Sequence, residues 1–247
     1  ETAGRSVAAI CGDEIKKIVL ELGGSDPFIV FADADLDLVM QSAVMARVQN
    51  NGQSCIAAKR YSLEQPIAAA LVARLKDAFE KLKVGDPLSE ETDVGPLVDE
   101  KSVAEIERQV QESVARGAKI VTGGKRLDLP GAFYAPTILE NVAPGMAAYD
   151  EEIFGPVLSV IVAHDEEDAI RIANDTRFGL GASLWTRDVE RAKTFASRIE
   201  AGCVFVNSMV KSDPRLPFGG IKKSGYGREL SSWGLREFVN IKCVWIA

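Results

Sequence analysis

Histidine is almost absent from the sequence, since His164 is the only one among 247 residues. A Ser-His-Asp or Cys-His catalytic pair could therefore use only this residue. His164 stands in "VAHDEEDAIRIAN", between an expected strand and the acidic start of an expected helix, which is typical of an exposed turn. A cysteine enzyme with this composition would need a carboxylate as its base.

Cysteine is scarce too, and no CxxC pair occurs. The four cysteines lie far apart in the chain, at Cys11, Cys55, Cys203 and Cys243. In a chain of this size, such spacing indicates free thiols in a reducing compartment, and neither a disulfide framework nor a zinc site. We therefore expect a cytoplasmic protein without a bound metal.

Long hydrophobic runs and basic clusters are also missing. No apolar run approaches the roughly 20 residues that span a bilayer, and the first residues carry no signal-peptide pattern. The net charge is −7 and no block of Lys and Arg interrupts it, which argues against a nucleic acid or an anionic membrane as partner. Hydrophobic residues make up 47% of the chain, as is ordinary for a globular protein with a sizeable core.

Helix and strand patterns alternate along most of the chain. Strand patterns occur at 16–24, 26–31, 58–64, 118–124, 157–163, 181–186 and 203–207. Helix patterns occur at 1–13, 33–52, 66–85, 99–117, 165–176, 188–202 and 231–238. The alternation predicts an α/β fold, in which a parallel sheet carries helices on both faces.

The last forty residues differ from the rest in composition and periodicity. Residues 208–229 are rich in Gly and Pro and show no periodicity, and structureless stretches of that length inside a domain are usually functional. Residues 239–247 ("VNIKCVWIA") alternate like a strand. A terminal apolar strand leaves an open edge, so we expect it to pair with another subunit.

Two stretches contain candidate catalytic side chains. In "VLELGGSDPFIV", Glu21 is expected at the carboxyl end of a strand, where parallel sheets face their binding crevice, and Gly23-Gly24 would allow a ligand to approach the backbone. In "NNGQSCIAAKR", Cys55 follows a helix that stops at Gly52, which puts the thiol in a loop. From these stretches alone, a strand-end glutamate and a structural cysteine remain open alternatives.

Two further stretches could bind a ligand. "EEIFGPV" offers Glu152, whose carboxylate could bond ribose hydroxyls, and Phe154, which could stack on a flat ring. "PFGGIKKSGYGREL" has the composition of a phosphate-binding loop but matches neither the P-loop nor the Rossmann fingerprint. Read alone, the first is an ordinary turn, and the second is weak evidence for phosphate.

Taken together and in this order, the motifs of the chain resemble those of the aldehyde dehydrogenase superfamily. The resemblance covers the chain from near residue 1 to its end, and the matching stretches are "LELGGSDP", "NNGQSC", "VGDPLSEETDVGPL", "EEIFGPV", "NDTRFGLGASLWT", "GCVFVN" and "PFGGIKKSGYGREL". It implies a three-layer catalytic domain, NAD or NADP as cofactor, an aldehyde substrate and a homo-dimer or homo-tetramer.

The resemblance also assigns roles to single residues. Cys55 corresponds to the nucleophile, Glu21 to the general base and Glu229 to a glutamate that helps to relay protons. Glu152 corresponds to the ligand of the nicotinamide ribose, and Phe154 to the residue that packs near the nicotinamide. The thiolate would add to an aldehyde, and the thioester left after hydride transfer would be hydrolysed by water that Glu21 activates. The carboxylate base agrees with the lack of a suitable histidine.

The sequence departs from the family in length. Family members are roughly twice as long, and "ETAGR" resembles the tail of their Gly-Ser-x-x-x-Gly phosphate motif, with Gly4 as its last glycine. The resemblance implies a remnant of the dinucleotide-binding domain at 1–23, the catalytic domain at 24–217, a return segment with a short helix at 218–238 and an oligomerisation strand at 239–247. We expect that these residues alone do not catalyse NAD(P)-dependent oxidation at a useful rate.

Within the superfamily, the chain is most similar to bacterial succinate-semialdehyde dehydrogenases. A substrate with a carboxylate tail calls for an arginine or hydroxyls near the pocket mouth, and the candidates are Arg215, Ser212 and Arg47. Where other members of the subfamily have an arginine six residues before the nucleophile, this chain has Gln49.

Two other functions remain open at this point. An acylating dehydrogenase would pass its thioester to coenzyme A, although a hydrolytic base at Glu21 argues against that reaction. A redox-silent subunit that binds or forms oligomers would agree with the short chain and the unpaired strand at its end.

Overall fold

A seven-stranded sheet forms the centre of the computed structural model, which describes residues 1–247. Its strands are β2 (Pro27–Val30), β3 (Arg60–Glu64), β4 (Lys119–Thr122), β5 (Thr137–Glu140), β6 (Val157–Ala163), β7 (Gly181–Trp185) and β8 (Cys203–Val206). The strand order is β4-β5-β6-β3-β2-β7-β8, and every neighbouring pair is parallel except β4 with β5. The expected α/β class with a mostly parallel sheet is confirmed.

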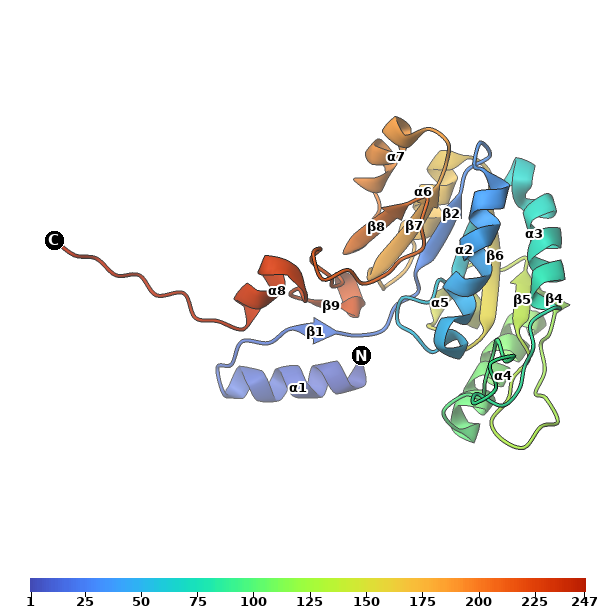
Figure 1. Ribbon diagram of the computed structural model, residues 1–247, viewed down its shortest axis with the longest axis horizontal. Helices are drawn as coiled ribbons and strands as arrows, with labels where there is room; N and C mark the ends of the chain where they lie inside the picture. Colours follow the sequence, from blue (N-terminus) through green and yellow to red (C-terminus); the bar gives the residue numbers. More distant parts are fainter.

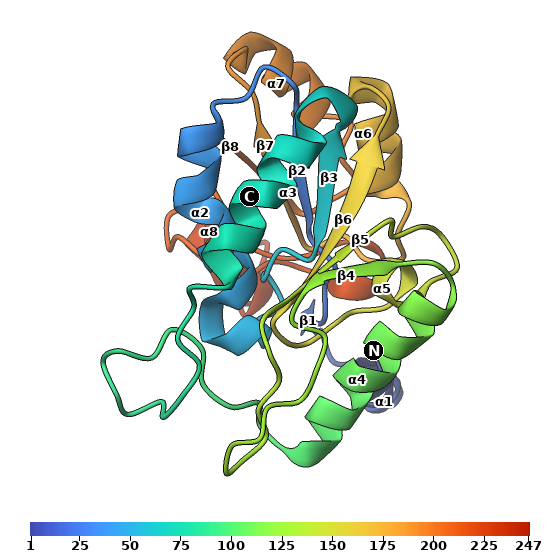
Figure 2. The same cartoon turned by 90° about the vertical axis from the view of Figure 1, so that its right-hand side faces the viewer.

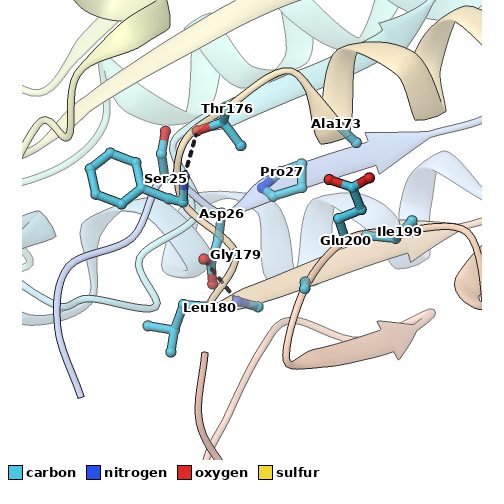
Figure 3. A pocket seen from close by; sticks show the side chains of 12 residues that line it. Ser25, Asp26, Pro27, Ala173, Thr176, Gly179, Leu180, Ile199 and Glu200 are labelled. Atoms are coloured by element: carbon cyan, nitrogen blue, oxygen red, sulfur yellow. Dashed lines mark hydrogen bonds between the residues drawn. The ribbon is translucent and has the colours of Figure 1, made fainter. Parts of the chain in front are cut away.

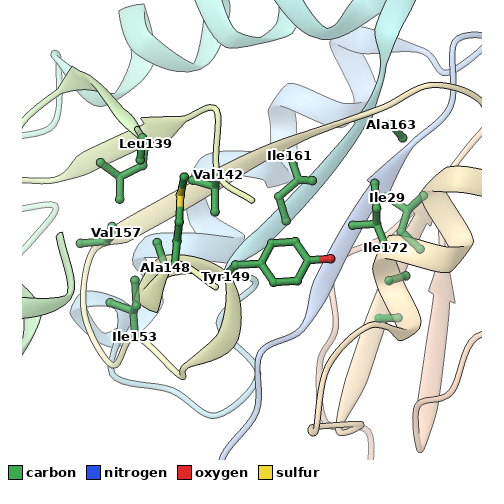
Figure 4. Packing of buried hydrophobic residues seen from close by; sticks show 14 of the residues in the cluster. Ile29, Leu139, Val142, Ala148, Tyr149, Ile153, Val157, Ile161, Ala163 and Ile172 are labelled. Carbon is green, nitrogen blue, oxygen red and sulfur yellow. The ribbon is translucent and has the colours of Figure 1, made fainter. Parts of the chain in front are cut away.

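Helices cover both faces of this sheet (Figures 1 and 2). On one face lie α2 (Leu36–Val48) and α3 (Gln65–Phe79), whose apolar side chains join one core cluster with residues of the sheet. On the other face lie α4 (Glu100–Ala115), α5 (Ala147–Asp150), α6 (Glu166–Asn174) and α7 (Val189–Ala196), which share a second cluster. Figure 4 shows this second layer, in which Tyr149 lies beside Ile161 of β6. The predicted three-layer arrangement is therefore present.

Local signals in the sequence explain where these helices begin. Four of them start after an aspartate whose side chain accepts a hydrogen bond from the backbone of the first turn, and these are Asp35, Asp99, Asp165 and Asp188. Such caps satisfy N–H groups that have no partner inside the helix. Buried strands such as β2 and β6 read as continuous apolar runs because helices cover both of their faces.

A smaller group of elements lies beside the sheet (Figure 1). It contains α1 (Thr2–Asp13), the antiparallel pair of β1 (Leu20–Glu21) and β9 (Gly225–Tyr226), the short 3₁₀ helix η2 (Lys222–Ser224) and α8 (Ser231–Glu237). An ion pair at 2.9 Å joins Lys17 to Glu237. No helix of the chain combines the length and the apolar character needed to cross a membrane.

The structure corrects several sequence-based expectations. The strand expected at 16–24 shrinks to β1 and lies outside the main sheet, while β5 and α5 were not expected at all. The helix expected to end at Gly52 ends at Val48 and is followed by the 3₁₀ turn η1 (Gln49–Gly52). Residues 239–247 form no strand within this chain, and their expected pairing with another subunit stays a prediction. Instead they extend away from the body (Figure 1).

Candidate active site

The motif residues converge at the amino-terminal ends of the parallel strands. Gly24 precedes β2, Cys55 precedes β3 and Leu180 precedes β7. A Cβ built on Gly24 would lie 2.7 Å from the carbonyl oxygen of Cys55 and 3.3 Å from Cβ of Leu180. Glu21 does end a strand, β1, but this strand pairs antiparallel with β9 outside the main sheet, so the expectation that Glu21 lies at the carboxyl end of a parallel-sheet strand is wrong.

The loop that carries Cys55 has an unusual backbone, which its sequence explains. Asn50, Asn51 and Gly52 have φ values of 49°, 59° and 75°. Asparagine and glycine tolerate this left-handed region better than other residues. Gly52 is also closely packed, since a Cβ there would lie 2.2 Å from the carbonyl oxygen of Gly155. The Asn-Asn-Gly run thus turns the chain sharply between α2 and the thiol.

Side chains fix this loop to its surroundings. Asn51 accepts a hydrogen bond from the N–H of Gly95 at 2.7 Å and donates one to the carbonyl of Pro96 at 3.1 Å. Gln53 accepts one from the N–H of Val98 at 2.9 Å. The segment after α3 therefore braces the Cys55 loop, although it lies far along the chain.

Arg47 also acts on this loop, from inside the protein. It is 1% exposed, and its guanidinium donates a hydrogen bond to the carbonyl of Gly52 at 2.7 Å. Burial lowers the pKa of Arg47 to about 10. This position contradicts the expectation that Arg47 lies at the mouth of a substrate pocket, and it indicates that the side chain supports the loop.

The thiol of Cys55 is half-buried among acidic groups. Burial raises the pKa of Cys55, and the charges of Asp26 and Glu21 raise it further, whereas the N–H of Ile56 opposes the shift. In the resting chain, the thiol form is therefore favoured near neutral pH.

Glu21 is held next to the glycine-rich segment. Its Oε1 is buried without a hydrogen-bond partner and would lie 2.7 Å from a Cβ built on Gly219. Burial raises the pKa of Glu21 to about 7, with a further contribution from the charge of Glu229, while Arg228 and the N–H of Gly220 oppose it. A carboxyl group with this pKa can accept a proton near neutral pH.

Glu152 faces a polar cavity next to Gly23. One oxygen of its carboxylate accepts a hydrogen bond from the N–H of Gly24 at 2.8 Å, and the other would lie 2.2 Å from a Cβ on Gly23. The cavity measures about 440 Å³, and Thr2, Gln109 and Arg177 also line it. The glycine thus keeps the carboxylate accessible from this cavity.

These residues fit part of a dinucleotide. The carboxylate of Glu152 can accept hydrogen bonds from ribose hydroxyls, and Phe154 is 45% exposed beside a second cavity that Glu152 also lines. Gly4 is buried, and a Cβ there would lie 2.7 Å from Cδ1 of Leu22. This glycine therefore allows α1 to approach the strand that contains Glu21.

The substrate candidates Arg215 and Ser212 lie on an exposed loop. The guanidinium of Arg215 is held by Asp213, with hydrogen bonds of 2.9 and 2.6 Å. A mostly apolar cavity of about 380 Å³ adjoins this loop, and Asp213 and Phe218 are among the residues that line it.

Two charged residues that the sequence analysis did not single out lie in the same region. Asp26 is 1% exposed beneath Cys55, and Lys59 is 1% exposed and donates hydrogen bonds to the carbonyls of Tyr149 and Glu151, just before Glu152. The available signal was a charged residue placed directly before each of the strands β2 and β3, which are mostly buried.

Comparisons with known proteins agree with these motifs. The model of the aldehyde dehydrogenase family matches residues 1–244. A curated relative named succinate-semialdehyde dehydrogenase [NADP(+)] 1, from Mycobacterium tuberculosis (strain ATCC 25618 / H37Rv), is 55% identical over 247 residues, which is 100% of this chain and 54% of the relative. A relative from Mycobacterium leprae (strain TN), named succinate-semialdehyde dehydrogenase [NADP(+)], is also 55% identical over the same shares.

Solved structures with similar folds include enzymes with the same name as these relatives. Succinic semialdehyde dehydrogenase from Streptococcus pyogenes, in complex with NADP+, is similar with a TM-score of 0.97 and 40% identity, over 99% of this chain and 54% of that one. Succinate-semialdehyde dehydrogenase from Burkholderia pseudomallei is similar with a TM-score of 0.94 and 41% identity, over 98% and 50%. The chain spans about half the length of the curated relatives it matches.

Proposed function

The chain belongs to the aldehyde dehydrogenase family, and on that premise we propose that it contains the nucleophile and the base of an NAD(P)-dependent aldehyde-oxidising enzyme. Cys55 is the proposed nucleophile and Glu21 the proposed base. The observation that carries this proposal is the contact between the segment that follows Glu21 and the loop of Cys55. Gly24, three residues after Glu21, packs against the backbone carbonyl of Cys55.

The proposed reaction has two stages on Cys55. The thiolate adds to the aldehyde carbon, so that a C–S bond forms and the carbonyl electron pair moves to oxygen, giving a thiohemiacetal. When bound, the dinucleotide would accept a hydride at this point, which leaves a thioester. Glu21 then takes a proton from water as the water oxygen attacks the thioester carbon, and the C–S bond breaks to release the acid and the thiolate.

The proposed cofactor contacts come from several segments. Glu152 would accept hydrogen bonds from ribose hydroxyls, Phe154 would pack against the flat ring, and Gly4 would keep the start of α1 close to the site. We propose Glu229 as a group that passes protons from Glu21, because it is near enough for its charge to raise the pKa of Glu21. NADP is favoured over NAD because the relatives at 55% identity are named for NADP(+).

Succinate semialdehyde is the proposed substrate, on the basis of the relatives' names. We propose that Arg215 and Ser212 bind its carboxylate tail, which requires Arg215 to exchange its contact with Asp213 for one with the substrate. The Arg215→Ala variant should then raise KM for succinate semialdehyde far more than KM for propanal. Equal effects on the two aldehydes would remove Arg215 from the substrate site.

We propose the same division of the chain as the resemblance implies: a cofactor-domain part at 1–23, the catalytic domain at 24–217, a return segment at 218–238 and an oligomerisation strand at 239–247. The last segment exposes Ile241, Val244 and Trp245, whereas β8 has a neighbour on only one side. Edge strands readily accept a further strand. We therefore propose that this segment of one copy pairs with β8 of another, in the cytoplasm, as part of a homo-dimer or homo-tetramer.

Two measurements test this assembly and the activity. Light scattering should give a smaller particle for a variant without residues 239–247 than for the whole chain, and an unchanged particle would exclude this pairing. For activity, an intact mass first establishes the length of the protein as it occurs in the cell. That protein should then reduce NADP+ with succinate semialdehyde, whereas its Cys55→Ala variant should not, and activity in the variant would overturn the proposed nucleophile.

A further inference from the structure

Lys59 is a buried basic residue that the proposed reaction does not use. It directly precedes β3, four residues after Cys55, and is 1% exposed. Its Nζ donates hydrogen bonds to the backbone carbonyls of Tyr149 and Glu151. Lysine is rarely buried so deeply, so its presence at this position needs an explanation.

The backbone of Lys59 is fixed in the sheet. Its N–H donates a hydrogen bond to the carbonyl of Asp26 at 3.1 Å, and its carbonyl accepts one from the N–H of Ser159 at 2.9 Å. Asp26 stands where the chain enters β2 (Figure 3), and Ser159 belongs to β6. The side chain of Lys59 therefore extends from a fixed point between the two strands that neighbour β3.

The segment that Lys59 bonds leads directly to the proposed cofactor ligand. Residues 149–152 run from Tyr149 in α5 to Glu152, and we call them segment 149–152. From α4, Gln109 donates hydrogen bonds at 2.9 Å to the carboxylate of Glu151 and to the carbonyl of Glu152. Segment 149–152 is thus held both by α4 and by the residue that precedes β3.

The carboxylate of Glu152 has little room for displacement. One of its oxygens accepts the hydrogen bond from the N–H of Gly24 at 2.8 Å, and the other would lie 2.2 Å from a Cβ on Gly23. A shift of segment 149–152 by about 1 Å would lengthen the bond to Gly24 beyond the usual range of hydrogen bonds. This bond therefore reports where the carboxylate lies.

We propose that Lys59 is a positioning residue for the dinucleotide. It holds segment 149–152 against the sheet, so that the carboxylate of Glu152 stays beside Gly24 and accessible to ribose hydroxyls. The inference rests on the proposed role of Glu152 as ligand of the nicotinamide ribose. It adds a link between that ligand and the nucleophile, because Lys59 ends the loop that carries Cys55 into β3.

The inference concerns the position of Glu152 and does not depend on the charge of Lys59. Burial lowers the pKa of Lys59 well below its usual value, and the charges of Arg60 and Arg47 lower it further. A neutral amine still has two N–H donors, which is enough for the carbonyls of Tyr149 and Glu151. The contacts that hold segment 149–152 are therefore available in either protonation state.

The first test compares wild type with Lys59→Met, which keeps an unbranched side chain and removes the donors. Hydrogen exchange at the N–H of Gly24 is measured by mass spectrometry with electron-transfer fragmentation, before cofactor is added. We expect exchange there to be about tenfold faster in the variant, the effect of losing roughly one hydrogen bond. The N–H of Gly181, which donates to Asp26, should keep its wild-type rate. Unchanged exchange at Gly24, or equal acceleration at both glycines, would overturn the inference.

Lys222→Met is the matched control. The ammonium of Lys222 also donates hydrogen bonds to two backbone carbonyls, those of Asn174 at 3.0 Å and Thr176 at 3.2 Å. The change therefore removes the same kind of contact from a segment that does not contain Glu152. Exchange at Gly24 should equal that of wild type. Exchange as fast as in Lys59→Met would show that the effect is not specific to Lys59 and would overturn the inference.

The second test measures cofactor binding in the protein as it occurs in the cell, through the fluorescence of NADPH. In Lys59→Met, the Kd for NADPH should rise about tenfold. This factor should exceed any loss in the rate of p-nitrophenyl acetate hydrolysis, which needs no cofactor. In the Glu152→Ala background the same change should add little, because Lys59 acts through Glu152. An equal effect in both backgrounds, or equal factors on binding and hydrolysis, would overturn the inference.

Lys59→Gln covers the case in which Lys59→Met fails to fold. Its shorter side chain cannot reach both carbonyls, so exchange at Gly24 should again be faster than in wild type, and wild-type exchange would overturn the inference. The two proposals can fail separately. An unchanged Kd for NADPH in Glu152→Ala would remove Glu152 from the cofactor site, whereas unchanged exchange at Gly24 would remove Lys59 as the residue that positions it.

Discussion

The carboxylate of Glu152 accepts a hydrogen bond from the backbone N–H of Gly24 at 2.8 Å, although 128 residues separate the two in the chain. This bond joins the segment before β6 to the segment before β2. The same Gly24 packs against the carbonyl of Cys55. One small residue therefore sets the spacing between the proposed cofactor ligand and the proposed nucleophile.

Gly24→Ala should disrupt this arrangement. Its Cβ would lie 2.7 Å from the carbonyl oxygen of Cys55, so the backbone of the Cys55 loop must move. We expect a loss of about 1–3 kcal/mol in the free energy of unfolding, as for other overpacked sites. The ester p-nitrophenyl acetate should acylate Cys55 without a cofactor, so its hydrolysis reports on the proposed nucleophile and base. Its rate should fall about 100-fold in this variant, because small displacements of reacting groups are costly.

Gly12→Ala is the control for that variant. No atom lies within 4 Å of a Cβ at Gly12, which is part of α1. Alanine in a helix should raise the free energy of unfolding by up to about 1 kcal/mol and leave the hydrolysis rate unchanged. If the two alanine variants behaved alike, the packing at Gly24 would not control the site.

The second prediction concerns pH. Glu21 acts as a base only when it is deprotonated, and its pKa is about 7. The breakdown of an acyl group on Cys55 should therefore speed up as pH rises through about 7 and then level off. In Glu21→Gln this step should be slow at every pH, as measured by single-turnover decay of the acyl-enzyme.

Glu229→Gln tests the cause of that pKa. The charge of Glu229 raises the pKa of Glu21, so its removal should move the inflection to lower pH. An inflection that stayed in place would mean that the charge of Glu229 does not contribute to the pKa of Glu21.

The third prediction distinguishes a supporting role of Arg47 from substrate binding. In Arg47→Met, the carbonyl of Gly52 loses the hydrogen bond that Arg47 donates, which should lower the free energy of unfolding by about 2 kcal/mol. Both succinate semialdehyde and propanal should react more slowly, by the same factor. A loss confined to succinate semialdehyde would restore Arg47 as a substrate ligand.

The sequence was sufficient to predict most of the helices and strands of the main sheet and the order of the motifs. Asp35 and Asp99 mark the starts of α2 and α4, because aspartate is a favoured N-cap residue. The apolar run of β6 predicts a strand with both faces covered. Such signals are local, so they can be read without knowing the tertiary structure.

Features that depend on contacts between distant segments could not be predicted in this way. The sequence around Glu21 has a strand pattern, yet β1 pairs with the distant β9 and not with the sheet. Arg47 has the pattern of an exposed helix residue, but the Cys55 loop folds over it. Asp26 stands in an ordinary turn sequence, yet the fold buries it to 1% exposure, where its carboxylate accepts a hydrogen bond from the distant Gly181.

The most direct test of the account is to trap the acyl group. Glu21→Gln is mixed with p-nitrophenyl acetate, and the acetylated residue is identified by peptide mass spectrometry. The account predicts a single acetyl group on Cys55 that persists far longer than in wild type, because the base that hydrolyses it is missing. An acetyl group on another residue, or one on Cys55 that decays as fast as in wild type, would contradict it.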